Sequence, residues 1–258
     1  MAGGMTPDVA IVLGTYNRRV LLQACVASLR PSVGDLDYEI IVVDGGSDDS
    51  TQHWARCQPD IVLIEQSLPL TGAVVAFNLG FARAVDDGCP WVVQFNDDIQ
   101  CVGSEPEIAH AVWLMEACPS VGAVAFESDV YRQRDTNRPE YDLPYHHGVP
   151  HFNQGVVRRE SGMSCARAMG DATGKAWWCR DHHTYGSDTE LTGWLTRLGW
   201  EIHHGIGLCV HSAEPNDRMA LMNRGGYATE YLLTERWGQP ESMTYRRDEA
   251  ERFGGFLR

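Results

Sequence analysis

The chain has 258 residues, of which 43% are hydrophobic and 22% charged, and its formal net charge is −14. This composition is typical of a soluble globular protein, and the length fits one α/β domain with an elaborated second half. The negative charge disfavours nucleic acid and anionic membranes as partners, because like charges repel. No apolar stretch approaches the ~20 residues of a membrane span, and residues 1–8 lack the apolar core of a signal peptide, so we expect a cytosolic protein.

The eight cysteines are scattered along the chain and include no C-x-x-C pair. Without a secretory signal we expect them to be reduced thiols, several of them inside apolar runs. A structural zinc site is not expected from this spacing. The adjacent histidine pairs point to different faces of any regular element, so we expect them to line loops and the acceptor site.

The first hundred residues alternate short apolar runs with segments of helical periodicity. Continuous apolar strands that alternate with helices indicate a parallel sheet covered on both faces. We expect strands over 9–13, 40–43, 61–64 and 91–95, and helices over 19–30 and 72–85, the first of which Pro31 should end.

The second half of the chain is less regular. A helix is expected over 108–117 and a strand over 121–126. Residues 130–160 show weak periodicity, and we interpret them as a long loop excursion that forms the acceptor pocket. We expect a single domain with a donor-binding half over 1–101, an acceptor and catalytic half over 102–217, which includes a structured block over 161–211, and a C-terminal part over 218–258 that is helical from about 218 to 237.

Asn96-Asp97-Asp98 directly follow the apolar run 91–95. Burying ionised carboxylates costs several kcal/mol unless a cation or hydrogen bonds compensate them. Two acids at the end of a core strand therefore suggest a hard divalent cation that holds a phosphate ligand, although an acidic turn is the simpler alternative. Ligands of open parallel sheets collect at the carboxyl edge of the strands, where Thr15-Tyr16 and Asp44 also fall.

Several of these segments together resemble family-2 glycosyltransferases of the GT-A fold. In order and spacing they cover most of the chain, and the excursion over 130–160 is the part they do not cover. The matching segments are 9–17 (VAIVLGTYN), 40–51 (IIVVDGGSDDST), 78–80 (NLG), 95–99 (FNDDI), 185–191 (YGSDTEL), the approach to Val210-His211, and the tail 223–238.

The resemblance implies an α/β fold with a mostly parallel, Rossmann-like central sheet, and a nucleotide-diphosphate sugar, UDP-linked by preference, lying across the strand ends. It implies a Mn²⁺ or Mg²⁺ ion bound by Asp98, with His211 completing the metal shell. Asn96 stands where the family's motif has its first acid. The residues implied to contact the donor are Thr15, Tyr16, Asn17, Asp44, Asn78 and Asp97; core packing of Tyr16 and a capping turn at Asp44 are the structural alternatives.

Residues 187–190 open a helix whose apolar stripe is formed by Leu191, Trp194, Leu195 and Leu198. Ser187 and Glu190 have the spacing of a capping box, which leaves Asp188 free for another role. Inverting transfer to a hydroxyl needs one carboxylate to accept the acceptor's proton, while the metal stabilises the leaving diphosphate. We expect Asp188 to be this general base, with Glu190 as the second choice.

Other functions stay open at this stage. Both acidic motifs lack their first acid, so a nucleotide-sugar-binding protein without catalysis is one alternative. A nucleotidyltransferase is disfavoured because the chain has a single lysine, Lys175, and no glycine-rich phosphate loop. The acceptor is expected to be a small molecule or a glycan, and a hydroxylated base in nucleic acid is the alternative. A basic groove for nucleic acid would use Arg132, Arg134, Arg138, Arg158 and Arg159.

Overall fold

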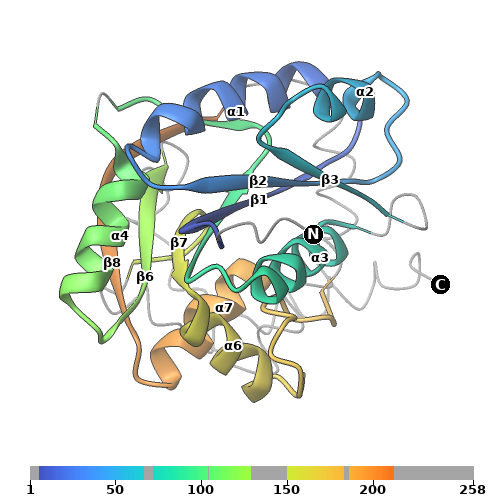
Figure 1. Cartoon of the computed structure of the whole chain (residues 1–258). Coiled ribbons are helices and arrows are strands. Elements are labelled where there is room, and N and C mark those ends of the chain that lie inside the picture. The colour runs from blue at the N-terminus through green and yellow to red at the C-terminus, as the bar shows by residue number, and fades with distance from the viewer. Residues whose placement is uncertain (1–5, 67–71, 104, 129–149, 183–185, 212–258) are drawn as a thin grey trace, which may run out of the picture.

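The computed structural model describes residues 6–66, 72–103, 105–128, 150–182 and 186–211, and the statements below refer to these. They form one twisted eight-stranded sheet with helices on both faces (Figure 1). The strands are β1 (Val9–Thr15), β2 (Tyr38–Asp44), β3 (Ile61–Glu65), β4 (Trp91–Asn96), β5 (Ile99–Cys101), β6 (Val121–Ser128), β7 (Gly155–Arg158) and β8 (Glu201–His211). The helices are α1 (Arg19–Ser32), α2 (Thr51–Arg56), α3 (Ala73–Asp87), α4 (Glu107–Ala117), α6 (Arg159–Ala168) and α7 (Ser187–Arg197).

The N-terminal half is the predicted parallel sheet, in the order β3-β2-β1-β4. Side chains of β1 alternate between two apolar clusters, as period-2 geometry requires. Ile11 and Leu13 pack with α1 and α4, whereas Ala10 and Val12 pack with α3, α6 and α7. Because both faces are covered, the strand can be apolar at nearly every position.

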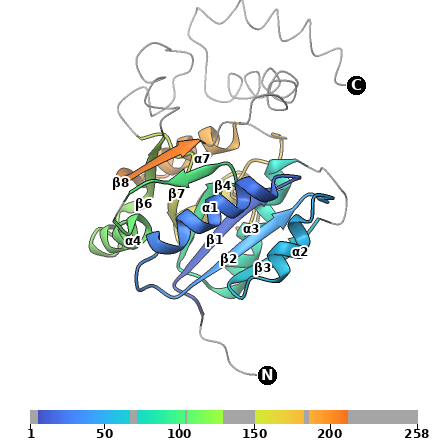
Figure 2. The same ribbon diagram turned by 90° about the horizontal axis from the view of Figure 1, so that it is seen from above.

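The other half of the sheet is mixed. β7 runs antiparallel to both β4 and β6, β8 runs parallel to β6, and β5 pairs with β8. In Figure 2 β6, β7 and β8 lie beyond β4, on the side away from β2 and β3. The N-terminal strands therefore deliver their carboxyl ends to one rim, and β7 brings a distant segment back to β4.

Three sequence predictions need correction or fall outside the description. The predicted loop excursion over 130–160 is wrong at its C-terminal end, because residues 155–158 form a central strand and α6 begins at Arg159. A four-residue strand that begins with glycine and ends with arginine leaves little periodic signal. Pro31 lies inside the last turn of α1 rather than ending it. Residues 129–149 and 212–258, which include the predicted helical tail, lie outside the described residues.

All eight cysteines are free, as predicted. In the described part of the chain, no helix combines the length and the apolar character that crossing a bilayer requires.

Gly80 sets the distance between α3 and β1. A Cβ atom at this position would lie 2.2 Å from a methyl carbon of Val12, whose side chain is fully buried. Val12 is packed within an apolar cluster between β1 and the helices on that face, so a contact this short would displace packed atoms. The contact therefore requires a residue without a side chain.

We predict that Gly80→Ala lowers the free energy of unfolding. Overpacking costs about 1–3 kcal/mol, which exceeds the gain of about 1 kcal/mol from the higher helix propensity of alanine. Chemical denaturation measures the change, and Val75→Ala, at an exposed position of the same helix, is the control with an effect of about 0.5 kcal/mol or less. A Gly80→Ala protein as stable as the parent would contradict the close packing of α3 on β1.

Candidate active site

The acidic motif lies in the turn between β4 and β5. Asp97 and Asp98 are only 5% and 3% exposed. One guanidinium nitrogen of Arg18, the residue that precedes α1, donates to both carboxylates, over 3.1 Å to Asp97 and 3.2 Å to Asp98. Thr15 Oγ1 donates to the second oxygen of Asp97 over 2.8 Å. The two carboxylates therefore converge on a point that a single cationic group can occupy.

Burial dominates the electrostatics of Asp97. Loss of solvent raises the pKa of its carboxyl group from 3.8 to about 6, since the ionised form is poorly solvated there. The positive charge of Arg18 opposes this shift, and the adjacent Asp98 adds to it. Two buried acids beside one arginine form an electron-rich oxygen site, which is the donor chemistry that Mg²⁺ and Mn²⁺ prefer.

The loops after β1 and β2 are tied together beside this motif. Asn17 has a left-handed backbone (φ 50°), which asparagine tolerates better than most residues. Its backbone N–H donates to Ser47 Oγ, and its side-chain oxygen accepts from the backbone N–H of Asp48, both over 2.8 Å. Tyr16 is 39% exposed beside Gly45, so core packing does not explain this tyrosine. An exposed aromatic side chain therefore lies beside two loops that are joined by hydrogen bonds.

Asp44 lies fully buried at the end of β2. Its carboxylate accepts hydrogen bonds from the N–H groups of Gly46 and Ser47, from Ser47 Oγ, and from Gln52 Nε2 over 2.7 Å. These contacts fix the turn that leads to α2. The geometry matches the turn-forming alternative for Asp44.

Asn78 of α3 uses both ends of its amide on the backbone of Trp178. Its nitrogen donates to the carbonyl of Trp178 and its oxygen accepts from the N–H of the same residue, each over 2.9 Å. The indole N–H of Trp178 donates to Gln94 of β4 over 2.7 Å. Asn78 therefore anchors the segment before α7, and this contact was not apparent from the sequence.

Asp188 belongs to the first turn of α7 and is joined to the acidic motif through one residue. Asn153 donates its amide N–H to Asp188 Oδ2 over 2.5 Å, and its side-chain oxygen accepts from the amide of Asn96 over 3.4 Å. Gln94 also holds the carbonyl of Asn153 over 2.7 Å. The end of β4 and the start of α7 are therefore linked through Asn153.

The predicted capping box at α7 is wrong. The helix is preceded by Gly186 with a left-handed backbone (φ 90°), and no side chain caps its N-terminus. Ser187 donates instead to the carbonyl of Cys179. Helical residues two positions apart in the sequence are about 200° apart around the axis, so Glu190 points away from Asp188. Glu190 is fully buried and contacts His182 and Trp194.

The backbone of His211 pairs with that of Ile99, the residue after Asp98, across the β5–β8 ladder. The backbone of His211 therefore lies across the ladder from the residue that follows Asp98, the other position predicted to bind metal. The side chain of His211 lies outside the described part of the structure.

The side chains of Arg158 and Arg159, two of the five arginines of the predicted basic groove, are engaged with backbone carbonyls. Arg158 donates to the carbonyls of Val121 and Met115, and Arg159 to that of Gly88. These contacts stabilise backbone at the edge of the core. The other three arginines of the predicted groove lie outside the described residues.

Sequence reasoning missed three residues of this site. Arg18 follows the matched segment 9–17 directly, so its place in the motif was a usable signal. Gln94 is a polar residue inside an apolar strand, which marks a buried hydrogen-bond partner. Asn153 lies in a stretch without periodicity, and nothing local indicated it.

Comparison with known proteins identifies the class of fold and then the family. The chain is similar to a mannosyltransferase from Pyrobaculum calidifontis in complex with GDP-mannose and Mn²⁺, with a TM-score of 0.62 and 21% identity over 95% of this chain and 70% of that one. It is also similar to glucosyl-3-phosphoglycerate synthase from Mycobacterium tuberculosis in complex with Mn²⁺, UDP-glucose and phosphoglyceric acid, with a TM-score of 0.61 and 19% identity over 92% and 82% of the two chains. These likenesses show a GT-A fold.

The model of glycosyl transferase family 2 matches residues 10–169, which is more than half of the chain. The chain belongs to glycosyl transferase family 2, and it is a glycosyltransferase. No curated protein matches the sequence significantly.

We predict that Asp97 makes metal-free protein less stable as the pH rises. Its folded pKa of about 6 lies above the unfolded value, so its contribution is fully present below about pH 4 and is lost through pH 6. With chelator present, the stability of Asp97→Asn relative to the parent should increase by about 2–3 kcal/mol between pH 4 and pH 7. Urea unfolding at each pH measures this difference. A difference that stays constant across this range would contradict the raised pKa.

Proposed function

We propose that this protein is an inverting, metal-dependent glycosyltransferase that moves a sugar from a UDP-sugar to an acceptor hydroxyl. The observation that carries the proposal is the hydrogen-bond path from Asn96 through Asn153 to Asp188. It joins the acidic motif of the donor side to a carboxylate on α7. The family match and the nucleotide complexes of similar structures support the donor class.

The residues at the end of β4 fit a divalent cation. Asp97 and Asp98 present oxygen ligands in a buried setting, and Arg18 already bridges both with one cationic nitrogen. In the proposal Asp98 holds the ion, Asp97 faces the ribose, and the backbone position of His211 is adjacent. Bound there, Mn²⁺ or Mg²⁺ would stabilise the charge that develops on the leaving diphosphate.

Tyr16 and Asn17 border the nucleotide base in this proposal, with Thr15 and Asp44 beneath them. The loops after β1 and β2 are linked before a ligand arrives, because Asn17 hydrogen-bonds to Ser47 and Asp48. A preorganised site loses less entropy on binding. Asn78 acts indirectly, by holding the Trp178 backbone beside Gln94.

Asp188 accepts the proton of the acceptor hydroxyl as its oxygen attacks the anomeric carbon from the face opposite the diphosphate. The bond to the diphosphate oxygen breaks in the same displacement, which inverts the anomeric centre. Asn153 donates to Oδ2 of Asp188 and so fixes the orientation of the carboxylate. The other candidate base, Glu190, is fully buried against His182 and points to the far side of α7.

The acceptor in this proposal is a small molecule or a glycan end. The net charge of −14 opposes nucleic acid, and Arg158 and Arg159 are engaged with backbone carbonyls. Residues 130–149 of the predicted excursion contribute to the acceptor pocket in this proposal, and they lie outside the described residues.

We predict that UDP-sugars raise the melting temperature only when Mn²⁺ or Mg²⁺ is present. A ligand that binds the folded state stabilises by mass action, by about 2.7 kcal/mol at 100 times its dissociation constant. A thermal-shift screen of UDP-, GDP-, ADP- and TDP-sugars with and without metal measures this. Asp98→Asn should abolish the metal-dependent part of the shift. Equal shifts without metal, or none with any nucleotide sugar, would refute the proposed donor site.

We predict that Asp188→Asn lowers kcat by about 10²–10⁴-fold, the usual contribution of a general base, and leaves UDP-sugar binding intact. Release of UDP during turnover measures kcat, and calorimetry measures donor binding. Asp86→Asn is the matched control, since Asp86 is an exposed carboxylate paired with Lys175. Undiminished turnover in Asp188→Asn would exclude this base.

Asn153→Ala provides an intermediate case for the same prediction. It removes the donor that orients Asp188 but leaves the carboxylate, so kcat should fall by about tenfold, less than in Asp188→Asn. The donor dissociation constant should stay unchanged. Loss of donor binding instead would mean that Asn153 supports the nucleotide side of the site.

A further inference from the structure

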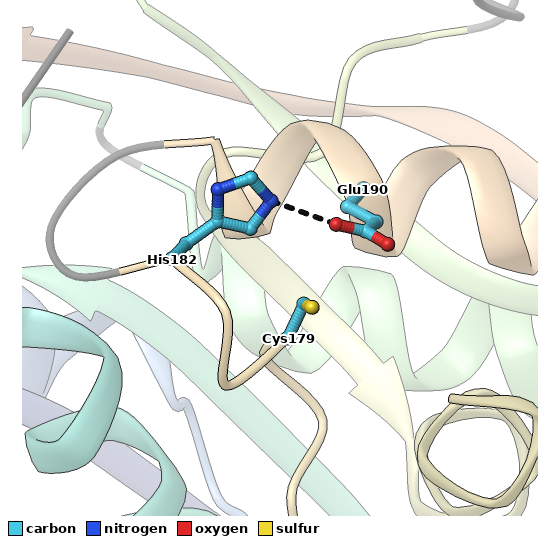
Figure 3. Close-up of side chains that lie close together, drawn as sticks. All are labelled: Cys179, His182 and Glu190. Atoms are coloured by element: carbon cyan, nitrogen blue, oxygen red, sulfur yellow. Dashed lines mark hydrogen bonds and ion pairs between the residues drawn. The ribbon is translucent and has the colours of Figure 1, made fainter. Parts of the chain in front are cut away.

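A second cluster of metal-ligating side chains lies on the other side of α7, away from the acidic motif. Cys179, His182 and Glu190 are 6%, 4% and 0% exposed, and their ligand atoms all lie within 4.8 Å of one another (Figure 3). His182 Nε2 and Glu190 Oε2 are 2.7 Å apart. In the close-up the Cys179 sulfur lies beside this pair. Three different ligand types therefore meet in one buried place.

Two firmly held elements bring these residues together. Cys179 and His182 lie on the segment that follows Trp178, whose backbone is anchored by Asn78. Glu190 extends from the first turn of α7, and Ser187 of the same turn donates to the carbonyl of Cys179. The spacing Cys-x-x-His on a loop, with a third ligand from a following helix, is an arrangement that suits a chelating site.

The two ring nitrogens of His182 have different surroundings. The other ring nitrogen of His182, Nδ1, is buried and has no hydrogen-bond partner within the described ranges. Nε2 faces Glu190 and is the ring nitrogen that would bind an ion in the cluster, whereas Nδ1 lies on the opposite side of the ring (Figure 3). A Zn²⁺ ion bound by a thiolate, a carboxylate and a neutral imidazole would make the buried group electrically neutral.

We propose that Cys179, His182 and Glu190 bind a zinc ion that fastens the loop after Trp178 to the start of α7. A thiolate with an imidazole and a carboxylate selects zinc over the oxygen-preferring Mn²⁺ and Mg²⁺. With ligand bonds of about 2.0 Å to nitrogen and oxygen and about 2.3 Å to sulfur in tetrahedral geometry, the His182–Glu190 separation widens from 2.7 Å to about 3.3 Å, and the Cys179 sulfur, now within 4.8 Å of both ligand atoms, lies about 3.5 Å from each. The site is separate from the proposed donor-binding metal.

A pocket adjoins two of the three ligand residues and would supply a fourth, solvent ligand. A pocket of about 320 Å³ is lined by Cys179 and Glu190 together with Asp171, Trp178 and Trp194. It gives the ion a route of entry and room for a water ligand. The ion holds the helix turn that carries Asp188, so it orients the proposed base without touching the substrate.

Metal analysis of the full chain tests the proposal. The protein is expressed with ZnSO₄, desalted, and measured by plasma mass spectrometry, and we expect about one zinc per chain. Cys179→Ser and Glu190→Gln should each lose at least about 80% of it. Asp98→Asn, which alters the other metal site, and Cys57→Ser, at an exposed cysteine, should retain it.

Cobalt substitution provides a readout that does not depend on activity or on variant stability alone. Co²⁺ bound to a thiolate gives an intense sulfur-to-metal absorption band in the near ultraviolet. We expect this band in the parent and in Asp98→Asn but not in Cys179→Ser. A chelator that removes the ion should lower the melting temperature by about 5 °C or more in the parent and leave folded Cys179→Ser unchanged.

Two results would overturn the proposal. One is parent protein that stays free of zinc after zinc supplementation and shows no cobalt–thiolate band. The other is a zinc content or cobalt spectrum in folded Cys179→Ser equal to that of the parent. Either result would leave His182 and Glu190 as a buried hydrogen-bonded pair, and neither depends on whether the protein binds UDP-sugars.

Discussion

Burial of two adjacent carboxylates at the end of β4 is the constraint around which this edge of the fold is organised. Asp97 and Asp98 lose nearly all contact with water, and a cost of several kcal/mol per ion follows unless positive charge or hydrogen bonds compensate it. Arg18 and Thr15 supply this compensation from the two ends of the loop between β1 and α1. The sheet has to be parallel here, because only parallel neighbours deliver both strand ends to the same rim. A site that holds anionic oxygens together at a cost to stability is the kind of site that a diphosphate-bound cation can use.

The antiparallel strand β7 makes the second contribution, because it returns a segment from far along the chain to β4. Asn153 lies just before β7 and reaches Asn96 on one side and Asp188 on the other. An asparagine at position 96 suits this role, since its amide can donate where a carboxylate would only accept. Asn96 therefore exchanges a charge of the family motif for a hydrogen bond that ties the end of β4 to α7 through Asn153. Gln94 adds rigidity by binding both Asn153 and Trp178 from within the strand.

The sequence predicted the parallel half of the sheet because its strands 9–13, 40–43 and 91–95 are continuous apolar runs, and the acids after β4 because buried charge is unusual enough to be noticed. It did not predict β7, since four residues between Gly155 and Arg158 carry no readable period. The capping box failed because Ser187 found a partner in the Cys179 carbonyl, a contact between segments that sequence spacing does not encode. Asn153 was missed for the same reason. The Cys-x-x-His spacing at 179–182 was visible, but its third ligand lies on a helix, so the cluster appears only when the chain is folded.

Helix α7 presents two different kinds of ligand on opposite sides because of its geometry. Residues two positions apart lie about 200° apart around a helix, so Asp188 and Glu190 face opposite sides of the same turn. Asp188 is hydrogen-bonded to Asn153, which links it to the end of β4, whereas Glu190 faces the softer set of Cys179 and His182. Hard and soft ligands select different ions, so two metals can be kept apart without a barrier between them. A displacement of this single turn would change the orientation of Asp188, and the buried contacts of Glu190 are what restrain that displacement from behind.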